Sequence, residues 1–444
     1  MKTVLKAALI LITLPGAGLF AQDFVGQDFR DALNDARAEL RAASGQNAAA
    51  QPAPQPAILP TPVNFQDDNT PAAPEKEWTI MVFVNGKSNL EGDGLSDINE
   101  MEKVGSTPGV NVIVELGQFS NDRMARYYIT KDTMPAQITS RMLGNAASVD
   151  MGDPAAVKNF TLWAEKRFPA KKYMLILWDH GSGWLRGNPV EDQGDAKGIS
   201  YDYITKHNID TPQLGRLIKG IEAGGGRVDL LAMDACLMQM AEVAYEMKDT
   251  KVTHIAASEE IEPGSGYPYD KWLPPLALKP SMGAAELGTI VAKEYLKQNP
   301  NGFQGKGLQY SVIELAKVPA LVAKMDLLAK AAMAAGDKAA VLRARAEATR
   351  YTIADNKDLR RFSQLLMKHS RNAEVKAAAA EVERMLEQGK GPVVFSGVSA
   401  KKTTLSYGIA AYVPETAADI RGYSDLKMSA DTSWDEFVNW LLVP

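Results

Sequence analysis

Two residues that can carry out acid–base and nucleophilic chemistry follow two apolar runs of this 444-residue sequence. His180 lies at the end of "LILWDHG", and Cys236, the only cysteine of the chain, ends "LLAMDAC". In open parallel sheets, reactive groups gather at the carboxyl ends of strands. If the two runs form neighbouring strands, the imidazole and the thiol lie across a narrow gap. A histidine there removes the thiol proton and later protonates the leaving amine of an acyl substrate.

Each of these residues alone also has an ordinary structural explanation. A lone cysteine on an apolar strand is usually a small buried hydrophobe. The joint placement, with Gly181 and Gly183 beside the histidine, favours chemistry instead. We expect the Gly181 amide to help stabilise an oxyanion. We also expect a helix to start at Cys236, with its dipole favouring the thiolate.

A zinc site competes poorly with this interpretation. The chain has one cysteine and four scattered histidines, which are His180, His207, His254 and His369. They show no spacing typical of zinc ligands. No metal site is therefore predicted.

The elements around these residues alternate between strand and helix from residue 78 to about 300. Apolar runs predict strands at 78–86, 110–117, 123–130, 172–181, 227–235 and 251–260. Helical patterns occupy 89–105, 153–168, 211–223 and 236–247, with Asp153 and Pro154 opening the second of these. This alternation predicts an α/β fold with a mainly parallel sheet covered by helices on both faces. Residues 318–389 are mainly helical, and a last strand at 403–414 precedes a closing helix at 433–442.

The composition is that of an ordinary globular protein. Hydrophobic residues make up 45% and charged residues 23% of the chain, and the net charge is −5. Acidic and basic side chains are mixed along the sequence. Because no basic face stands out, neither a nucleic-acid partner nor an anionic membrane partner is expected.

The N-terminus predicts export. Lys2 and Lys6 precede a short apolar run, a Pro/Gly break and small residues, which together indicate a signal peptide at 1–21. The run is too short to span a bilayer. Residues 22–77 are rich in Ala, Pro, Gln and Asn, which indicates a flexible linker or pro-segment. We therefore expect a secreted or periplasmic protein.

The order and context of the two reactive residues lead to a family resemblance. The blocks "WTIMVFVNGKSNLE", "FPAKKYMLILWDHGSGW", "DLLAMDACLMQMAEVAYE", "ASEEIEPGSGYPY" and "YGIAAYVP" resemble the clostripain family of cysteine peptidases. The resemblance implies a caspase-like three-layer α/β/α sandwich with His180 as base and Cys236 as nucleophile. It also implies a peptidase core at 78–317, a helical insertion at 318–389 and a final strand and helix at 390–444.

Members of this family typically cleave after basic residues, with acidic side chains at the floor of the S1 pocket. Asp234, two residues before the cysteine, matches one such position, although its place fits a helix cap equally well. A second acid is harder to place. The segment "SEEIEPGSGYPY" offers Glu259, Glu260 and Glu262, while Ser265 stands where some members carry an acid.

Two further properties of the family apply as expectations. Some relatives mature by self-cleavage, for which Arg186 and Lys197 in the polar stretch 185–203 are candidate sites. Calcium activates some relatives, but no acidic loop here has EF-hand spacing, so a calcium requirement stays open and no cofactor is assigned.

The expected function is an exported cysteine endopeptidase acting on protein or peptide substrates. Two alternatives use the same fold. One is an inactive binding or scaffold protein, and the other is a peptide ligase or transpeptidase that uses the same His/Cys pair.

Overall fold

The computed structural model describes residues 65–67, 69, 71–134, 137–186, 197–399, 405–415, 420 and 422–443. They belong to one compact unit, Pro60–Pro444. The expected signal peptide, most of the expected linker and the stretch 187–196 lie outside these residues. So do the side chains of Arg186 and Lys197, the candidate self-cleavage sites.

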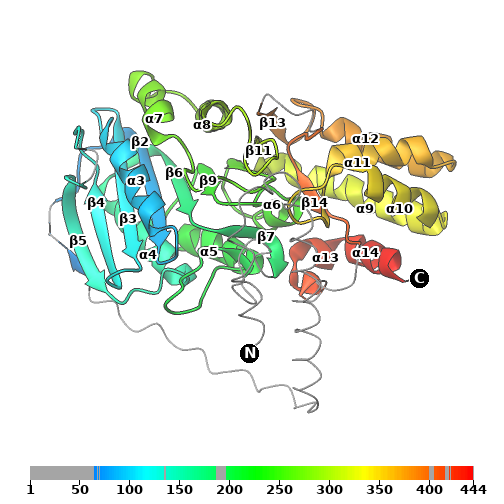
Figure 1. The fold of residues 1–444 in the computed structure, drawn as a ribbon, viewed down its shortest axis with the longest axis horizontal. Coiled ribbons are helices and arrows are strands. Elements are labelled where there is room, and N and C mark those ends of the chain that lie inside the picture. The colour runs from blue at the N-terminus through cyan, green and yellow to red at the C-terminus, as the bar shows by residue number, and fades with distance from the viewer. Residues whose placement is uncertain are drawn as a thin grey trace, which may run out of the picture. The chain divides into compact units, whose positions relative to one another are not determined.

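The centre of the unit is a mixed sheet (Figure 1). In spatial order its strands are β1 (Gln66–Asp67), β5 (Arg141–Ala147), β4 (Arg123–Tyr128), β3 (Val110–Gln118), β2 (Lys76–Gly86), β6 (Ala170–Trp178), β9 (Leu230–Asp234), β10 (His254–Ala257), β11 (Gln309–Glu314) and β13 (Val393–Val398). The five strands from β3 to β10 are parallel, and the strands on both flanks run antiparallel. The parallel strands are those that the apolar runs predicted.

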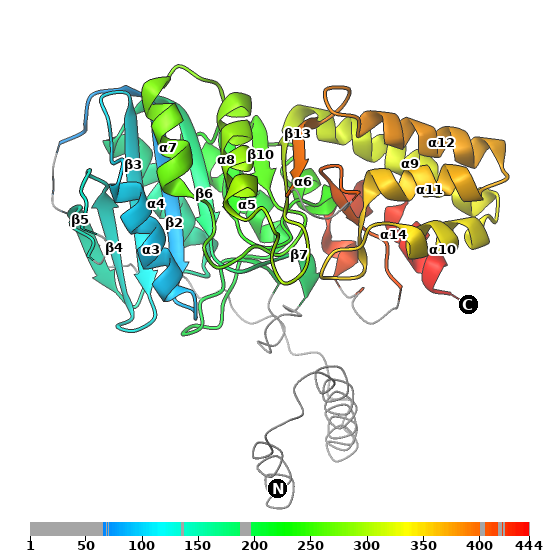
Figure 2. The ribbon, with the colours of Figure 1, turned by 45° about the horizontal axis from the view of Figure 1, so that its top comes forward.

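Helices cover both faces of this sheet, as the continuous apolar runs require. Along β2, Ile80 and Val82 face one apolar cluster, whereas Met81 and Phe83 face another. The first cluster includes side chains of α3 (Glu91–Glu102), α7 (Tyr269–Leu278) and α8 (Ala284–Gln298). The second includes those of α4 (Pro154–Arg167), α5 (Thr211–Ala223) and α6 (Ala241–Glu246). Figure 2 shows α3, α7 and α8 in front of the sheet.

The start of the unit differs from the expected boundary at Trp78. Strand β2 begins at Lys76, and β1 pairs with β5 through Gln66 and Asn145. The Asp67 carboxylate also forms an ion pair with Arg167 of α4. The last part of the expected linker is therefore built into the sheet.

The helical region beside the sheet contains α9 (Val318–Ala334), α10 (Lys338–Glu347), α11 (Leu359–His369) and α12 (Ala373–Met385) (Figures 1 and 2). Helix α9 packs against α6, against α12 and against α14 (Trp434–Leu442). The short helix α13 (Lys427–Asp431) precedes α14. Among the described helices, none combines the length and the apolar character that a bilayer crossing needs.

The last predicted strand, at 403–414, is shorter in the structure and lies outside the main sheet. Among the described residues of that range, only Ala410–Tyr412 form a strand, β14, which pairs with β12 (Asn356–Asp358). The sheet edge is β13, whose β-branched residues pair with β11. Strand β11 was not predicted either.

Candidate active site

The strands that carry the two candidate catalytic residues are direct neighbours. Strands β6 and β9 pair in parallel, with Trp178 opposite Asp234. His180 lies two residues after Trp178, and Cys236 lies two residues after Asp234. Both residues therefore follow the carboxyl ends of their strands, on the same side of the molecule. Gly181 packs on the Cys236 backbone so closely that a Cβ at position 181 would lie 2.4 Å from the Cys236 carbonyl oxygen. Only glycine fits this approach.

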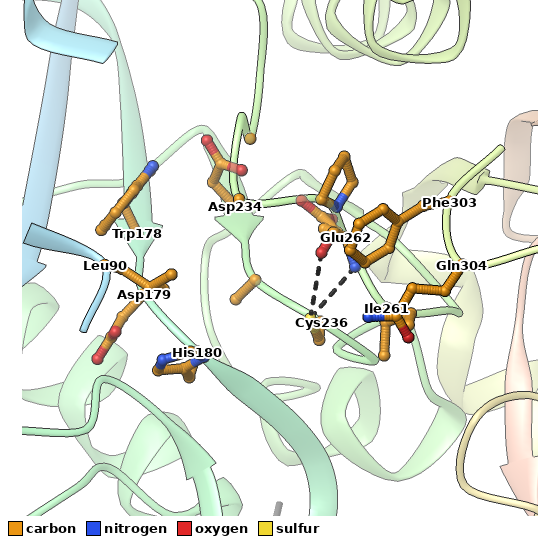
Figure 3. A pocket seen from close by; sticks show the side chains of 14 residues that line it. Leu90, Trp178, Asp179, His180, Asp234, Cys236, Ile261, Glu262, Phe303 and Gln304 are labelled. Carbon is orange, nitrogen blue, oxygen red and sulfur yellow. Dashed lines mark hydrogen bonds between the residues drawn. The ribbon is translucent and has the colours of Figure 1, made fainter. Parts of the chain in front are cut away.

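His180 and Cys236 line one pocket (Figure 3). Asp234 and Glu262 line it as well, together with the apolar side chains of Trp178 and Phe303. The candidate base, nucleophile and acidic specificity residue therefore share one cavity. This combination of convergent polar groups and apolar walls is typical of a ligand site.

The His180 ring is held by neighbours that the sequence did not suggest. Its Nε2 atom lies 2.7 Å from Asn89 Oδ1, and the Tyr203 ring stacks on it at a centroid distance of 6.0 Å. Asn89 lies three residues after Gly86, the last residue of β2, and β2 is the neighbour of β6. A polar residue just past the adjacent strand end was the signal that could have identified it.

The Asp179 carboxylate bonds to the strand ends around it, and the His180 backbone N–H is one of its donors. Its buried carboxylate accepts hydrogen bonds from Asn85 Nδ2 at 3.0 Å, from Ser88 Oγ at 3.2 Å and from the Tyr201 backbone N–H at 2.5 Å. Burial raises the pKa of Asp179 well above its ordinary value. The role of Asp179 is to join the strand ends on which the site is built.

The expected helix at Cys236 is wrong. Helix α6 begins at Ala241, and Leu237 has a positive φ of 66°. The intervening backbone bonds to the next segment, since Leu237 N–H donates to Glu260 O and Gln239 N–H to Ser258 O. No helix dipole therefore acts directly on the thiol, and Asp234 caps no helix.

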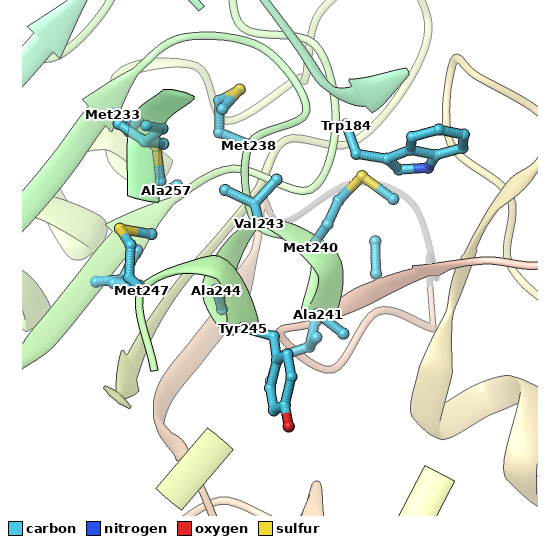
Figure 4. Packing of buried hydrophobic residues seen from close by; sticks show 14 of the residues in the cluster. Trp184, Met233, Met238, Met240, Ala241, Val243, Ala244, Tyr245, Met247 and Ala257 are labelled. Carbon is cyan, nitrogen blue, oxygen red and sulfur yellow. The ribbon is translucent and has the colours of Figure 1, made fainter. Parts of the chain in front are cut away.

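Apolar side chains anchor the turn that carries Cys236. Met238 and Met240 are buried, and Figure 4 shows Met240 beside Trp184. Gly183, at φ 65°, lies against the Met240 sulfur, where a Cβ would approach to 2.5 Å. The nucleophile therefore sits on a rigid support.

The Cys236 side chain is partly exposed to the pocket. Its Sγ accepts a hydrogen bond from the Glu262 backbone N–H at 3.2 Å (Figure 3). Burial is the largest influence and raises the pKa of the thiol to about 12, with the nearby Glu262 and Glu260 carboxylates adding to it. Deprotonation of Cys236 must therefore accompany substrate attack or follow a rearrangement.

Two buried carboxyl groups form the acidic end of the pocket. Asp234 Oδ2 accepts hydrogen bonds from Tyr267 N–H at 3.1 Å and from Tyr269 Oη–H at 2.9 Å. Burial raises its pKa to about 7. Burial and the neighbouring Asp234 raise the pKa of Glu262 well above its ordinary value. Apart from its interaction with Asp234, the Glu262 carboxylate has no hydrogen-bond partner among the described residues.

The other candidates for a second acid lie elsewhere. Glu260 accepts hydrogen bonds from the Ile261 and Thr352 backbone N–H groups. Glu259 is buried outside the pocket lining, and burial raises its pKa to about 8. Ser265 is exposed and is not part of the lining. Of the acids considered, Glu262 is the one that joins Asp234 in the pocket.

Among the described residues, no group of three or more His, Cys, Asp or Glu side chains is arranged to hold a metal ion.

The chain is similar to known cysteine proteases in sequence and in fold. The profile of the clostripain family matches residues 82–440. Clostripain from Hathewaya histolytica is 29% identical over 229 residues, which are 44% of this chain and 41% of that protein. The match thus spans less than half the length of that relative.

Solved structures show the same fold. One is a secreted C11 cysteine protease from Bacteroides thetaiotaomicron in complex with an irreversible peptide inhibitor, with a TM-score of 0.58 and 18% identity over 82% of this chain and 99% of that one. Another is an inactive zymogen C11 protease from Parabacteroides distasonis, with a TM-score of 0.59 and 17% identity over 81% of this chain and 99% of that one. These likenesses confirm the α/β/α sandwich with its helical C-terminal region.

Proposed function

Because this chain belongs to the clostripain family, we propose that it is a cysteine endopeptidase in which Cys236 is the nucleophile and His180 the base. One observation carries the proposal. His180 and Cys236 follow the neighbouring strands β6 and β9 and line the same pocket. A structural cysteine needs no histidine across a shared cavity.

The reaction follows the chemistry of these two side chains. Cys236 Sγ attacks the substrate carbonyl carbon while its proton passes to His180. The resulting oxyanion is held by backbone N–H groups near Gly181 and Cys236. His180 then gives the proton to the leaving amine, and a thioester remains on Cys236. Water, deprotonated by His180, hydrolyses the thioester and restores the thiol.

We assign Asp234 to recognition of a basic P1 side chain, with Glu262 beside it. A guanidinium or ammonium group entering the pocket would form charge-assisted hydrogen bonds with these carboxylates. Its positive charge would also offset the repulsion between the two acids and favour their ionised forms. Cleavage after Arg or Lys is therefore the expected specificity.

The protein is further proposed to be exported and to act on proteins or peptides outside the cytoplasm. The N-terminal segment 1–21 supports this through its basic start and short apolar run. The raised pKa of the Cys236 thiol fits a precursor that needs an activating event, and self-cleavage at Arg186 or Lys197 is one such event.

Covalent trapping tests the assignment of the nucleophile. A peptidyl ketone with Arg at P1 and a leaving group on the carbon next to the carbonyl should modify Cys236 in the exported protein, because the sulfur forms a thioether bond to that carbon as the leaving group departs. Because the peptide holds its electrophilic carbon against the thiol, this labelling should be at least about 10-fold faster than labelling by the same reagent with Asp at P1. Intact mass and peptide mapping measure both rates, and show whether the chain is single or cleaved. Equal labelling by both reagents would contradict the proposal.

A further inference from the structure

A tight hairpin forms the wall of the pocket that contains Phe303 and Gln304. Phe303 N–H donates to Lys306 O at 2.8 Å, and Lys306 N–H donates to Phe303 O at 2.9 Å. The tip residues Gln304 and Gly305 have φ values of 46° and 75°. Gly302 leaves no room for a side chain, since a Cβ there would lie 1.8 Å from the Lys306 carbonyl oxygen. The hairpin, residues 302–306, is thus closed by its own backbone.

The base of this hairpin is tied to the core and to the helical region. Lys306 Nζ donates a hydrogen bond to Thr352 Oγ1 at 2.5 Å and lies 3.4 Å from Glu260 Oε2. Glu260 also accepts a hydrogen bond from the Thr352 N–H at 2.9 Å. Glu260 lies two residues before Glu262, whose backbone N–H bonds to Cys236 Sγ. These contacts therefore fix the position of the hairpin relative to Cys236.

Two hairpin side chains reach the pocket. Phe303 is half-buried, packs against the apolar clusters of both sheet faces and lines the cavity. Gln304 lines it at the exposed rim. In Figure 3, both lie on the side of Cys236 away from His180.

The direction of a bound peptide follows from the proton transfer. His180 must reach the leaving amine, so the part of the substrate after the cut bond extends toward His180. The acyl part must then extend to the other side of Cys236. The P1 side chain points to Asp234 and Glu262, and the preceding residue, P2, comes next to Phe303.

We propose that Phe303 forms the wall of the P2 subsite and selects a large apolar side chain there. This rests on the peptidase function proposed above. An aromatic ring already held at the pocket edge contacts a P2 Leu or Phe without further ordering. A P2 Gly leaves the exposed part of the ring in water.

The test uses fluorogenic substrates with Arg at P1, in which P2 is Gly, Ala, Leu or Phe, and blocked Arg without P2. The wild-type chain should cleave the Leu and Phe peptides with kcat/KM about 10-fold above the Gly peptide, as one well-packed apolar side chain gives. Phe303→Ala should reduce that ratio to about 2-fold. Phe303→Leu should restore most of the preference.

Asn301→Ala is the matched control, because Asn301 is exposed in the same loop and does not line the pocket. It should keep the wild-type ratio. A uniform loss on all substrates in Phe303→Ala, or a wild-type enzyme indifferent to P2, would overturn the P2 assignment. A wild-type chain inactive even on blocked Arg would instead contradict the peptidase function itself.

Discussion

Replacing His180 with alanine is expected to lower kcat/KM for peptide cleavage by roughly 10³-fold, because general acid–base transfer contributes on this scale. Burial raises the pKa of the Cys236 thiol to about 12, so the thiol needs a base to give up its proton at neutral pH. Without the imidazole, the described lining of the pocket offers no other histidine to take that proton and return it to the leaving amine. Steady-state kinetics on an Arg peptide measures the loss.

A second histidine provides the control for this substitution. His369 bonds to Glu347 in the helical region and does not line the pocket. His369→Ala should therefore keep most of the activity, and circular dichroism should show both variants folded. If His180→Ala kept more than about a tenth of the wild-type activity, the role of His180 as the general base would be contradicted.

Asp234→Asn is expected to lower kcat/KM for Arg peptides by about 100-fold, while the slow cleavage of a P1 Ala peptide changes little. The reason is that a buried charge-assisted contact is lost for the cation only. Asp229→Asn is the matched control, because Asp229 lies at the opposite end of β9 and its carboxylate accepts from Tyr173 N–H. An equal loss on both peptides would mean that Asp234 supports the fold rather than the specificity.

The raised pKa of Asp234 gives this prediction a pH dependence. Its pKa rises from 3.8 to about 7 through burial. The carboxylate is therefore ionised only as the pH rises through about 7, and the Arg-to-Ala ratio of kcat/KM should increase over that range.

The raised pKa of Asp234 also affects stability, because the folded state holds the proton of this carboxyl group more tightly than the unfolded state does. The tighter proton binding stabilises the folded state. This stabilisation is complete below pH 3.8 and is lost as the pH rises to about 7. Asp234→Asn should not be less stable than wild type at pH 8.

Much of the site was predictable from the sequence because its residues follow long apolar strands. Continuous apolar runs located β2, β3, β6 and β9, and the parallel pairing of β6 with β9 brings His180 next to Cys236. The N-cap of α4 was also correct, since the Asp153 side chain accepts from the Ala155 N–H. These signals are local, and local patterns can be read without knowing what packs on them.

The features that the sequence did not reveal depend on contacts between distant segments. The stretch after Cys236 has helical composition, but its backbone bonds to residues 258–260 and delays α6 to Ala241. Asn89 contacts His180 from a loop 91 residues away in sequence. Phe303 reaches the pocket only because Lys306 ties its hairpin to Glu260 and Thr352. Hydrophobic periodicity in the sequence indicates helices and strands, but it does not predict contacts between distant segments.

One cleavage panel shows whether Cys236 cleaves peptides at a site for basic residues. Fluorogenic peptides with Arg, Lys, Ala or Asp at P1 are offered to the wild-type chain and to Cys236→Ala, with and without calcium, and before and after trypsin nicking. The expected result is cleavage after Arg and Lys by the wild type and none by Cys236→Ala. Equal cleavage by both proteins would contradict it, as would a wild type silent on every peptide, which would favour a scaffold protein.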